Sequence, residues 1–465
     1  MLRSSALPLL FASILLTGCT GDDVLPAPSA PRKWEKLAPP SSSSLGNVRE
    51  FVVARGIIHS HSPYSHDGCD GEGLDAMGNP DATCVEHLRR GMCEAGEDFV
   101  FLTDHAANMA YAEMNELLFI QPGDEPVKGA DGAPMANFIP CADGRKVMLM
   151  TGNENDLMTV GIEKHLPGDA ETRKAMYESD GASTVDAMHD VGALVFLAHT
   201  ESRSPDYLKT IPVDGVEIFN IHAAIDPDIR KDYFGLDPYA GAASILPFAR
   251  QDEDGPEPDL ALLGFLQDLP QYGQLWDPML AERHVTGITG TDVHENSFPG
   301  IMRDGERGDS YRRLMRWISN VMLVSGGISP ATVKDAIAAG RSYVAFEVIG
   351  VPSGFDFHAE DEGNVVEMGG QAKKGATLFV QAPRVWNLDP AVETPLITTK
   401  LLRIANGSTT VVAEGDQLRI DSAEAGVYRV EVRILPNHLR PYLGETPDTY
   451  IREYPWVFSN AIRIL

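Results

Sequence analysis

Two histidines stand directly after an apolar run near the start of this chain. His59 and His61 follow the β-branched run 51–58, and because side chains alternate across a strand, both imidazoles point to the same side. Imidazole is the commonest protein ligand of divalent transition metals, so the pair could supply half of a metal site. A His-x-His pair also occurs by chance on many strands, and further ligands are needed to decide.

Further metal-binding side chains follow other apolar runs in the same way. They are His66 with Asp67 in the loop after His61, Asp104 and His105 after 98–102, Glu154 after 147–151 with His165 further on, His199 after 193–198, and Asp292 and His294 after 285–289. Of the 13 histidines, seven fall at these places, whereas chance would scatter them. The pattern predicts a metal centre with the ligands His59, His61, His66, His105, Glu154, His165, His199, Asp292 and His294.

The elements that must position these ligands are short apolar runs that alternate with helical patterns. The runs are 51–58, 98–102, 147–151, 193–198, 215–219, 285–289 and 320–324, and the helical stretches include 83–95, 183–191 and 330–339. Continuous apolar strands between helices indicate an α/β fold with a parallel sheet covered by helices. Seven such strands suit a small (β/α) barrel over 51–350, in which the ends of the strands converge on one face.

Two other parts of the chain have a different character. The stretch 223–284 is rich in Asp, Pro and Gly and is predicted to be an insertion with its own short helices. After about residue 350, alternating apolar and polar residues are separated by Gly, Asn and Asp turns. This pattern predicts a C-terminal antiparallel β-sandwich over 351–465.

The N-terminus has the features of an export signal. Arg3 precedes an apolar run that ends in Leu16-Thr17-Gly18-Cys19, which resembles a bacterial lipobox. We expect residues 1–18 to be a lipoprotein signal peptide, although an ordinary signal peptide or an uncleaved anchor would fit the same run. The Pro- and Ser-rich segment 19–50 would then be a tether between a lipid anchor at Cys19 and the folded protein, at an outer membrane or the cell surface.

The net charge limits which classes of partner the protein can have, and export would decide whether the cysteines after Cys19 form disulfides. The chain of 465 residues has a formal net charge of −29, which argues against nucleic acid or anionic lipid as a broad-surface partner. The partner that we expect is a small-molecule substrate. In an exported protein, two disulfides are more expected than a thiolate metal site. Four cysteines allow three pairings, of which we favour Cys69–Cys84 with Cys93–Cys141.

The ordered set of motifs resembles the PHP (polymerase and histidinol phosphatase) family of metallohydrolases over 51–350. The motifs are His59-Ser-His61, Thr103-Asp104-His105, Glu154 with His199, and Asp292-Val-His294. The order of the two domains is also similar to an exported branch that includes carbamate-hydrolase-like members.

The resemblance implies a PHP-like barrel with up to three metal ions. It assigns His59, His61, Glu154 and Asp292 to the first ion, Glu154, His165 and His199 to the second, and His66, His105 and His294 to the third. Where many relatives have Asp, this chain has His66 followed by Asp67, so either residue could be the ligand. Imidazoles with two carboxylates suit Zn²⁺, Mn²⁺ or Fe²⁺, and we expect two or three such divalent ions.

Water bound to such ions becomes acidic enough to form a hydroxide nucleophile near neutral pH. We therefore expect a metal-dependent hydrolase, foremost a phosphoesterase that acts on small phosphate esters. Hydrolysis of a carbamate, ester or amide is the alternative, and a surface lipoprotein that only binds metal or ligand is an alternative of another class. Asp104 is expected to orient a ligand imidazole, and Arg203 could bind an anionic substrate or be an ordinary surface arginine.

Other polar residues allow a functional and a structural interpretation. Asn220 and His222 follow the run 215–219 and could line the cleft, but packing around the ligands is the favoured interpretation. A basic cluster comprises Arg303, Arg307, Arg312, Arg313 and Arg316. These arginines could steer anions, but salt bridges to the abundant carboxylates are the favoured interpretation.

Overall fold

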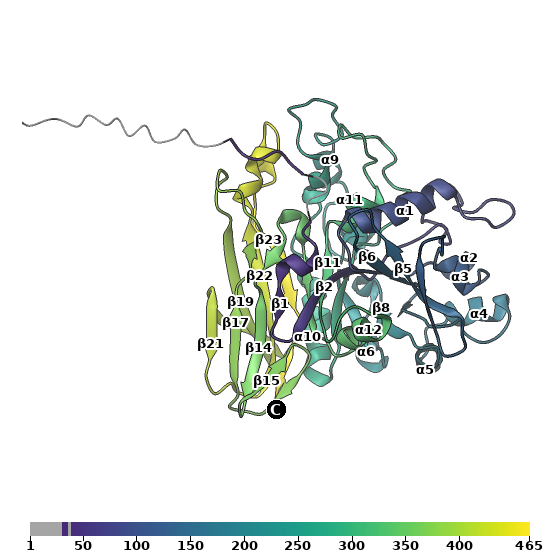
Figure 1. Cartoon of the computed structure of the whole chain (residues 1–465). Coiled ribbons are helices and arrows are strands. Elements are labelled where there is room, and N and C mark those ends of the chain that lie inside the picture. Colours follow the sequence, from purple (N-terminus) through teal and green to yellow (C-terminus); the bar gives the residue numbers. More distant parts are fainter. Residues whose placement is uncertain (1–29, 36–38) are drawn as a thin grey trace, which may run out of the picture.

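The computed structural model describes residues 30–35 and 39–465 as a mixed α/β protein (Figure 1). The predicted signal peptide and Cys19 lie outside the described residues. Within the described part, no helix combines the length and the apolar character that crossing a membrane requires. In Figure 1, the helices gather on one side of the molecule and the long C-terminal strands on the other.

A large mixed sheet runs through most of the molecule. Its 14 strands among the described residues follow the order β16 (Gln371–Ala372), β24 (Ile462–Ile464), β22 (Gly426–Leu435), β23 (Tyr454–Ser459), β12 (Ser342–Ala345), β11 (Ser319–Val324), β2 (Phe51–Ile57), β3 (Phe99–Phe101), β6 (Lys146–Met150), β5 (Pro134–Pro140) and β4 (Glu125–Lys128), with β1 (Asn47–Val48) beside β2, β19 (Leu396–Ala405) beside β22, and β20 (Ser408–Glu414) beside β19.

Three smaller sheets complete the strand structure of the described residues. They are β10 (Thr286–Gly290), β9 (Gly215–Asn220), β8 (Leu194–Leu197) and β7 (Leu157–Val160); β15 (Asn364–Glu367), β14 (Asp356–Asp361), β17 (Thr377–Gln381) and β21 (Gln417–Ile420); and β13 (Pro352–Ser353) with β18 (Arg384–Val385). All seven apolar runs predicted as strands form strands, namely β2, β3, β6, β8, β9, β10 and β11. Their pairing divides them between the large sheet and the β10–β7 sheet, and β11 runs antiparallel to β2.

A compact apolar core connects these two sheets. Ala54, Phe101 and Met150 from the large sheet share one buried cluster with Phe196 and Ile288 from the smaller one. At the carboxyl ends of the strands the backbones also meet, because the N–H of His61 donates to the carbonyl of Val293 at 2.8 Å. The ends of β2 and β10 are therefore held side by side.

The helices cover the strands of the N-terminal half. They are α1 (Ala82–Glu94), α2 (Ala106–Met109), α3 (Met114–Leu117), α4 (Ala170–Tyr177), α5 (Ala182–Asp190), α6 (Pro205–Thr210), α7 (Ile221–Ile225), α8 (Pro227–Asp232), α9 (Ala242–Ile245), α10 (Pro270–Glu282), α11 (Tyr311–Met315) and α12 (Pro330–Ala338), with short 3-10 helices η1 (Ser42–Leu45), η2 (Thr200–Ser202), η3 (Pro258–Gly264), η4 (Glu347–Ile349), η5 (Asn437–Tyr442) and η6 (Pro447–Thr449). The predicted helical stretches correspond to α1, α5 and α12, and the predicted insertion carries short helices as expected.

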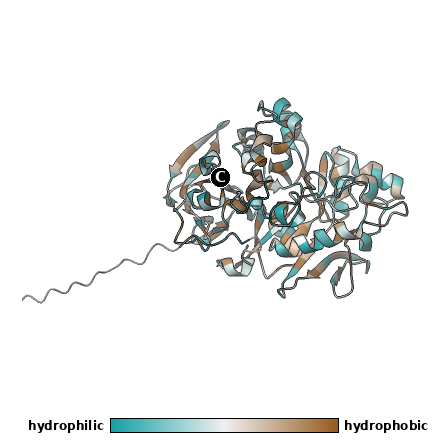
Figure 2. Cartoon of the chain, turned by 90° about the horizontal axis from the view of Figure 1, so that it is seen from above, coloured by the Kyte–Doolittle hydropathy of each residue, from teal (hydrophilic) through white to brown (hydrophobic). Residues whose placement is uncertain are grey.

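Local sequence explains where these helices begin and which face they bury. Asp81 caps α1 by accepting from the N–H of Cys84 at 2.8 Å, and Ser329 with Thr332 forms a capping box on α12. In α1 the buried residues include Val85, Leu88 and Met92, which recur at helical spacing. Figure 2 shows the resulting alternation of hydrophobic and hydrophilic residues along helices and strands.

The sheet continues across residue 350, where the sequence pattern changes. β12 pairs antiparallel with β23, so that Tyr343 lies opposite Ser459 and Ala345 opposite Val457. The predicted antiparallel stretches after residue 350 do form strands, among them β17, β19 and β22. The C-terminal strands are thus partly an extension of the large sheet, a feature that the change in sequence pattern did not indicate.

The described part of the predicted tether packs on the protein. The indole N–H of Trp34 donates to Asp259 at 2.9 Å, and the guanidinium of Arg55 donates to the carbonyl of Pro40 at 2.9 Å. β1 also pairs with β2, so residues 30–35 and 39–50 belong to the folded unit.

Both favoured disulfides are present. Cys69 is joined to Cys84 and Cys93 to Cys141, with Cα–Cα distances of 6.2 and 5.5 Å. The first disulfide ties the loop that follows His66 and Asp67 to α1.

Candidate metal centre

Histidines and carboxylates from the ends of six strands meet in one cluster. Its members form overlapping groups in which the possible ligand atoms lie within 4.8 Å of one another. We call the set the His/carboxylate cluster, and it comprises His59, His61, His66, Asp67, His105, Glu154, His199, His222, Asp292 and His294. Buried groupings of this composition can bind metal ions.

The centre of the cluster consists of two buried imidazoles and two carboxylates. His59 Nε2 lies 3.3 Å from Glu154 Oε1 and 3.5 Å from Asp292 Oδ1. His61 Nε2 lies 3.0 Å from Asp292 Oδ1 and 3.3 Å from Glu154 Oε2. Neither Nε2 atom makes a hydrogen bond with any described residue, although both are buried. Buried ring nitrogens that converge with carboxylate oxygens in this way fit cation binding.

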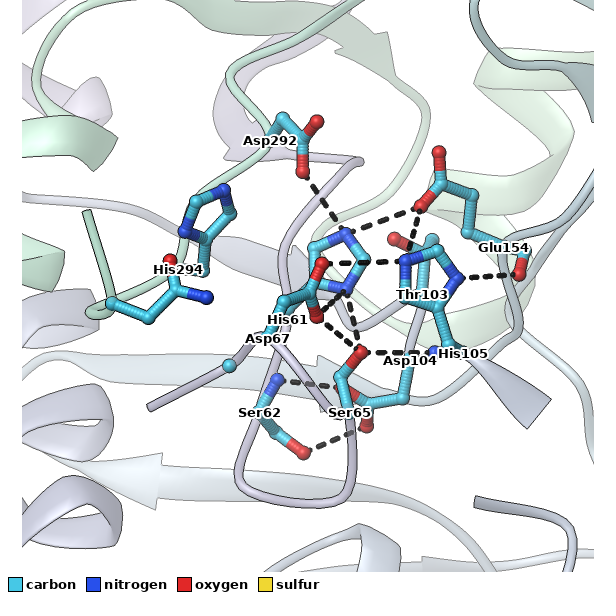
Figure 3. A network of polar contacts seen from close by, with 12 residues as sticks. His61, Ser62, Ser65, Asp67, Thr103, Asp104, His105, Glu154, Asp292 and His294 are labelled. Atoms are coloured by element: carbon cyan, nitrogen blue, oxygen red, sulfur yellow. Dashed lines mark hydrogen bonds and ion pairs between the residues drawn. The ribbon is translucent and has the colours of Figure 1, made fainter. Parts of the chain in front are cut away.

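On one side of the centre, Glu154 is shared with a group from the loop after His61 (Figure 3). His105 Nε2 lies 3.5 Å from Glu154 Oε2 and 3.3 Å from Asp67 Oδ2. His66 belongs to the same group, and its ring centroid is 4.6 Å from that of His105. Both His66 and Asp67 are therefore placed to be ligands, the alternative that the sequence left open.

On the other side, Asp292 is shared with three further histidines. His199 Nε2 lies 3.3 Å from Glu154 Oε1 and 3.6 Å from Asp292 Oδ2, so it lies between the two carboxylates. His222 Nδ1 lies 2.9 Å from Asp292 Oδ2. His294 completes this group with His222 and Asp292. His199 and Asp292 have φ angles of 49° and 53°, a left-handed conformation that costs roughly 1–3 kcal/mol and recurs at functional sites.

Two glutamates outside the cluster, both with buried side chains, hold its imidazoles in place. Glu217 accepts from His59 Nδ1 at 2.6 Å and from the backbone N–H of His199 at 3.0 Å. Glu201 lies 3.0 Å from His199 Nδ1 and accepts from the Tyr272 hydroxyl at 3.0 Å. A carboxylate that accepts a hydrogen bond from Nδ1–H keeps the proton on Nδ1, so that the lone pair of the neutral ring lies on Nε2 and is directed toward the centre.

A close approach at Gly290 makes the contact between His59 and Glu217 possible. A Cβ atom at this position would come within 2.0 Å of Glu217 Oε1 and 2.8 Å of His59 Nδ1. The end of β10 therefore has room only for glycine.

The carboxylates determine the charge state of the centre. Burial lowers the pKa of His59, but Glu154, Glu217 and Asp292 outweigh burial and raise that pKa to about 10. Burial likewise raises the pKa of Glu154 and of Asp292, but His59 and its neighbours reverse this and hold both pKa values well below their usual range. The cluster thus favours positive charge at its centre, and a metal ion would have to displace protons from imidazole to bind.

Asp104 has a different role from the one predicted. Its buried carboxylate accepts from the backbone N–H of Ser62 at 2.5 Å and from the Ser62 hydroxyl at 2.7 Å, and not from a ligand imidazole (Figure 3). Burial raises the pKa of Asp104 despite these hydrogen bonds. Asp104 therefore fixes the backbone between His61 and the His66 loop.

Two predicted site residues are engaged elsewhere. His165 Nε2 lies 2.9 Å from the carbonyl of Ala112, and His165 Nδ1 lies 3.2 Å from the Tyr177 hydroxyl, so both ring nitrogens have partners outside the cluster. Arg203 forms an ion pair with Asp156. The spacing of His165 from Glu154 suggests a ligand, but His165 instead contacts the hydroxyl of Tyr177 at the end of α4.

The grouping of ligands agrees in part with the assignment that the resemblance implied. His199 groups with Glu154, as that assignment has it, whereas His294 groups with His222 and Asp292 and not with His66 and His105. His222, for which packing was the favoured interpretation, belongs to the cluster. Its place directly after an apolar strand was the available signal, as for Glu217, a lone charge within the apolar run 215–219.

The arginines of the basic cluster pair with carboxylates, as favoured from the sequence. Asp259 accepts from Arg312 at 2.5 Å, from Arg313 at 2.6 Å and from Arg316 at 2.8 Å. Arg307 pairs with Asp70 and Asp309, and Arg303 with Glu257. We call Asp259 with Arg312, Arg313 and Arg316 the arginine cluster.

Comparisons with known proteins give little further information. No protein-family model and no curated protein matches the chain. Among solved structures, the chain is similar to that of PsfC from Pseudomonas syringae PB-5123, with 14% sequence identity and a TM-score of 0.33, over 61% of this chain and 88% of PsfC. A similarity of this degree carries no inference about fold or function.

Proposed function

We propose that the protein is a metal-dependent hydrolase whose active site is the His/carboxylate cluster. The observation that carries this proposal is the convergence of His59 and His61 on Glu154 and Asp292, with both Nε2 atoms buried and without a hydrogen bond among the described residues. Buried nitrogens of this kind are rare unless a ligand or ion engages them.

In such a site, some residues would bind the ions and others would orient the ligands. Glu154 and Asp292 each face both central imidazoles and one outer group, so each could be shared between neighbouring ions. Glu217 and Glu201 fix the imidazoles of His59 and His199. Divalent ions bound there would supply an acidic water and neutralise charge that develops on substrate oxygens.

Three adjoining groups of ligands support two or three divalent ions. The His59–His61 group forms the middle, the His66–Asp67–His105 group lies on one side and the His222–Asp292–His294 group on the other. Imidazole with carboxylate accommodates Zn²⁺, Mn²⁺ or Fe²⁺. The cluster supports this proposal even though His165 lies apart from it.

Membership of the PHP family and a distorted seven-stranded barrel are part of the proposal. In their support, the ligands follow β2, β3, β6, β8, β9 and β10, and the two sheets share the apolar core around Phe101 and Ile288. In (β/α) barrels, active-site residues gather in this way at the carboxyl ends of strands.

We propose phosphate monoesters or diesters of small molecules as the first substrate class. Adjacent ions would clamp the non-bridging oxygens of a phosphate, which suits three neighbouring groups of ligands. A second candidate is a carboxylic ester, amide or carbamate, favoured by the apolar cavity that adjoins Asp292.

Export and lipid anchoring through Cys19 complete the proposal. The disulfides Cys69–Cys84 and Cys93–Cys141 support it, because such bonds persist in oxidising compartments. We therefore place the enzyme outside the cytoplasm, at an outer membrane or the cell surface.

The test is metal analysis of the purified protein, followed by assays with aryl phosphates, aryl esters and aryl carbamates after loading with Zn²⁺, Mn²⁺ or Fe²⁺. We expect at least two ions per chain and turnover of one substrate class, which chelation abolishes. Tight metal binding without turnover of any class would replace the hydrolase with a metal-binding surface protein.

A further inference from the structure

An apolar cavity opens directly beside the outer histidines of the cluster. It has a volume of about 250 Å³, and its wall includes Asp292, His222 and His294. The remaining wall is dominated by Ile225, Ile245, Leu262, Phe298, Met302 and Leu314. A molecule that reacts at the cluster would therefore have an apolar chamber next to its reacting atom.

The polar groups of this wall are already engaged. Asp309 accepts from the backbone N–H groups of Ser297 and Phe298, at 2.8 and 2.5 Å. Asp226 caps α8 by accepting from the N–H groups of Asp228 and Ile229, both at 2.9 Å. The wall thus offers shape and apolar surface more than hydrogen bonds.

Apart from the histidines of the cluster, the described wall of the cavity offers no basic side chain to a second negative charge on the substrate. None of the described residues that line the cavity is lysine or arginine. The nearby Arg307 is held by Asp70 and Asp309, and the arginine cluster is held by Asp259. A carboxylate or second phosphate placed in the cavity would lose its hydration without gaining a partner.

We infer that the substrate carries an uncharged, apolar group of a few carbon atoms beside the bond that is cleaved, and that this cavity selects it. The inference rests on the proposed hydrolase function. The volume lies below the range of roughly 300–1,000 Å³ that drug-sized ligands occupy, which indicates a short alkyl or single aryl group. The apolar side chains that contact this group would set specificity, while the cluster acts on the bond.

The experiment measures binding separately from turnover. Alkanehydroxamic acids of two to eight carbons, which combine a metal-chelating head with an apolar tail, are titrated calorimetrically into the metal-loaded protein. Affinity should rise about fourfold for each added methylene until the cavity is filled, from the ~0.8 kcal/mol that burial of each CH₂ contributes. A matched series with a terminal carboxylate on the tail should bind at least about tenfold more weakly.

Substitutions test whether the gain in affinity with tail length arises in this cavity. Phe298 is 38% exposed, so Phe298→Asp should fold normally and should abolish the gain for longer tails, whereas Phe298→Leu should keep it. Val411→Asp, on the exposed face of β20, is the control for an added charge. Affinity that does not change with tail length, or equal binding of carboxylate tails, would overturn the inference.

Parallel assays with aryl esters and alkyl aryl phosphates of the same chain lengths separate the two proposals. Turnover that is independent of chain length would overturn the inference and leave the hydrolase standing. Chain-dependent hydroxamate binding without turnover of any substrate would overturn the hydrolase and still support selection of an apolar group by the cavity.

Discussion

The molecule contains two buried clusters of charge that differ in how completely they are satisfied. In the arginine cluster, Asp259 is the common partner of three guanidinium groups, and Asp304 and Glu306 supply further negative charge. In the His/carboxylate cluster, the buried Nε2 atoms of His59 and His61 lack hydrogen bonds among the described residues.

The backbone conformation also differs between the two clusters. His199 and Asp292 adopt left-handed φ angles, whereas Arg312 and Arg313 lie in the regular helix α11. A cluster that is closed on itself stabilises the fold, and one that retains open ligand atoms on strained backbone is suited to bind something. Four variants test whether the arginine cluster stabilises the fold and the His/carboxylate cluster binds metal.

The largest effect on stability is expected from Asp259→Asn. Removal of one partner from a buried ion network typically costs about 3–5 kcal/mol, and this change leaves three arginines with less negative charge. Denaturant unfolding should show that loss, while the metal content of the folded protein stays unchanged. Asp268→Asn, in an exposed pair with Arg433, is the control and should cost less than about 1 kcal/mol.

The same variant has a predictable dependence on pH. Burial raises the pKa of Asp259, but Arg316, Arg312 and Arg313 outweigh it and hold the pKa below its usual value. A carboxylate of this kind stabilises the fold above its unfolded pKa of about 3.9 and loses that contribution as the pH falls. The difference between wild type and Asp259→Asn should therefore shrink below about pH 4, and a constant difference would contradict the ionic explanation.

Glu154→Gln should lower both metal content and activity. Loss of an outer partner of a metal ligand costs roughly 10–100-fold, so loss of a carboxylate shared by two groups should cost at least about 100-fold in kcat/KM, with reduced metal content. His165→Gln is the matched control, because His165 bonds to Ala112 and Tyr177, and it should retain its metal. Equal metal loss in both variants would argue against the cluster described here.

Glu217→Gln should weaken metal binding by roughly 10–100-fold, because the amide holds the His59 ring less firmly than the carboxylate. Competition with a chelator of known affinity measures the change. Glu431→Gln, next to Arg429 and away from the cluster, should leave the affinity unchanged. An unaltered affinity in Glu217→Gln would mean that the His59–Glu217 hydrogen bond has no part in metal binding.

The smallest effect is expected from Arg203→Gln. Because Arg203 is paired with Asp156, its removal should change kcat/KM by less than about threefold, a difference below about 0.7 kcal/mol. Steady-state kinetics on the best substrate class test this prediction. A rise in KM of more than about tenfold for phosphate esters alone would restore the anion-binding role considered from the sequence.

Much of the strand structure and most of the cluster could be predicted because both follow from short stretches of sequence. A continuous apolar run such as 147–151 forms a strand wherever it packs, and a polar residue directly after it lies at the strand end. His59, Glu154 and Asp292 follow this rule, and all three meet.

The rest depends on contacts between distant residues. His165 stands close to Glu154 in sequence, but its position is decided by Tyr177 and Ala112. Glu217 and Glu201 become part of the site only because β9 and η2 lie beside His59 and His199. The strand pairing of β12 with β23 joins residues more than a hundred positions apart, and no local pattern records it.

That pairing has a consequence for how the chain is made. Until residues 454–459 pair with it, the outer edge of β12 has no neighbour on that side, and unpaired strand edges invite aggregation. A nascent chain cut off near residue 350 would expose this edge permanently. The sheet is completed only when β23 reaches β12, so the strands on the two sides of residue 350 must fold as one unit.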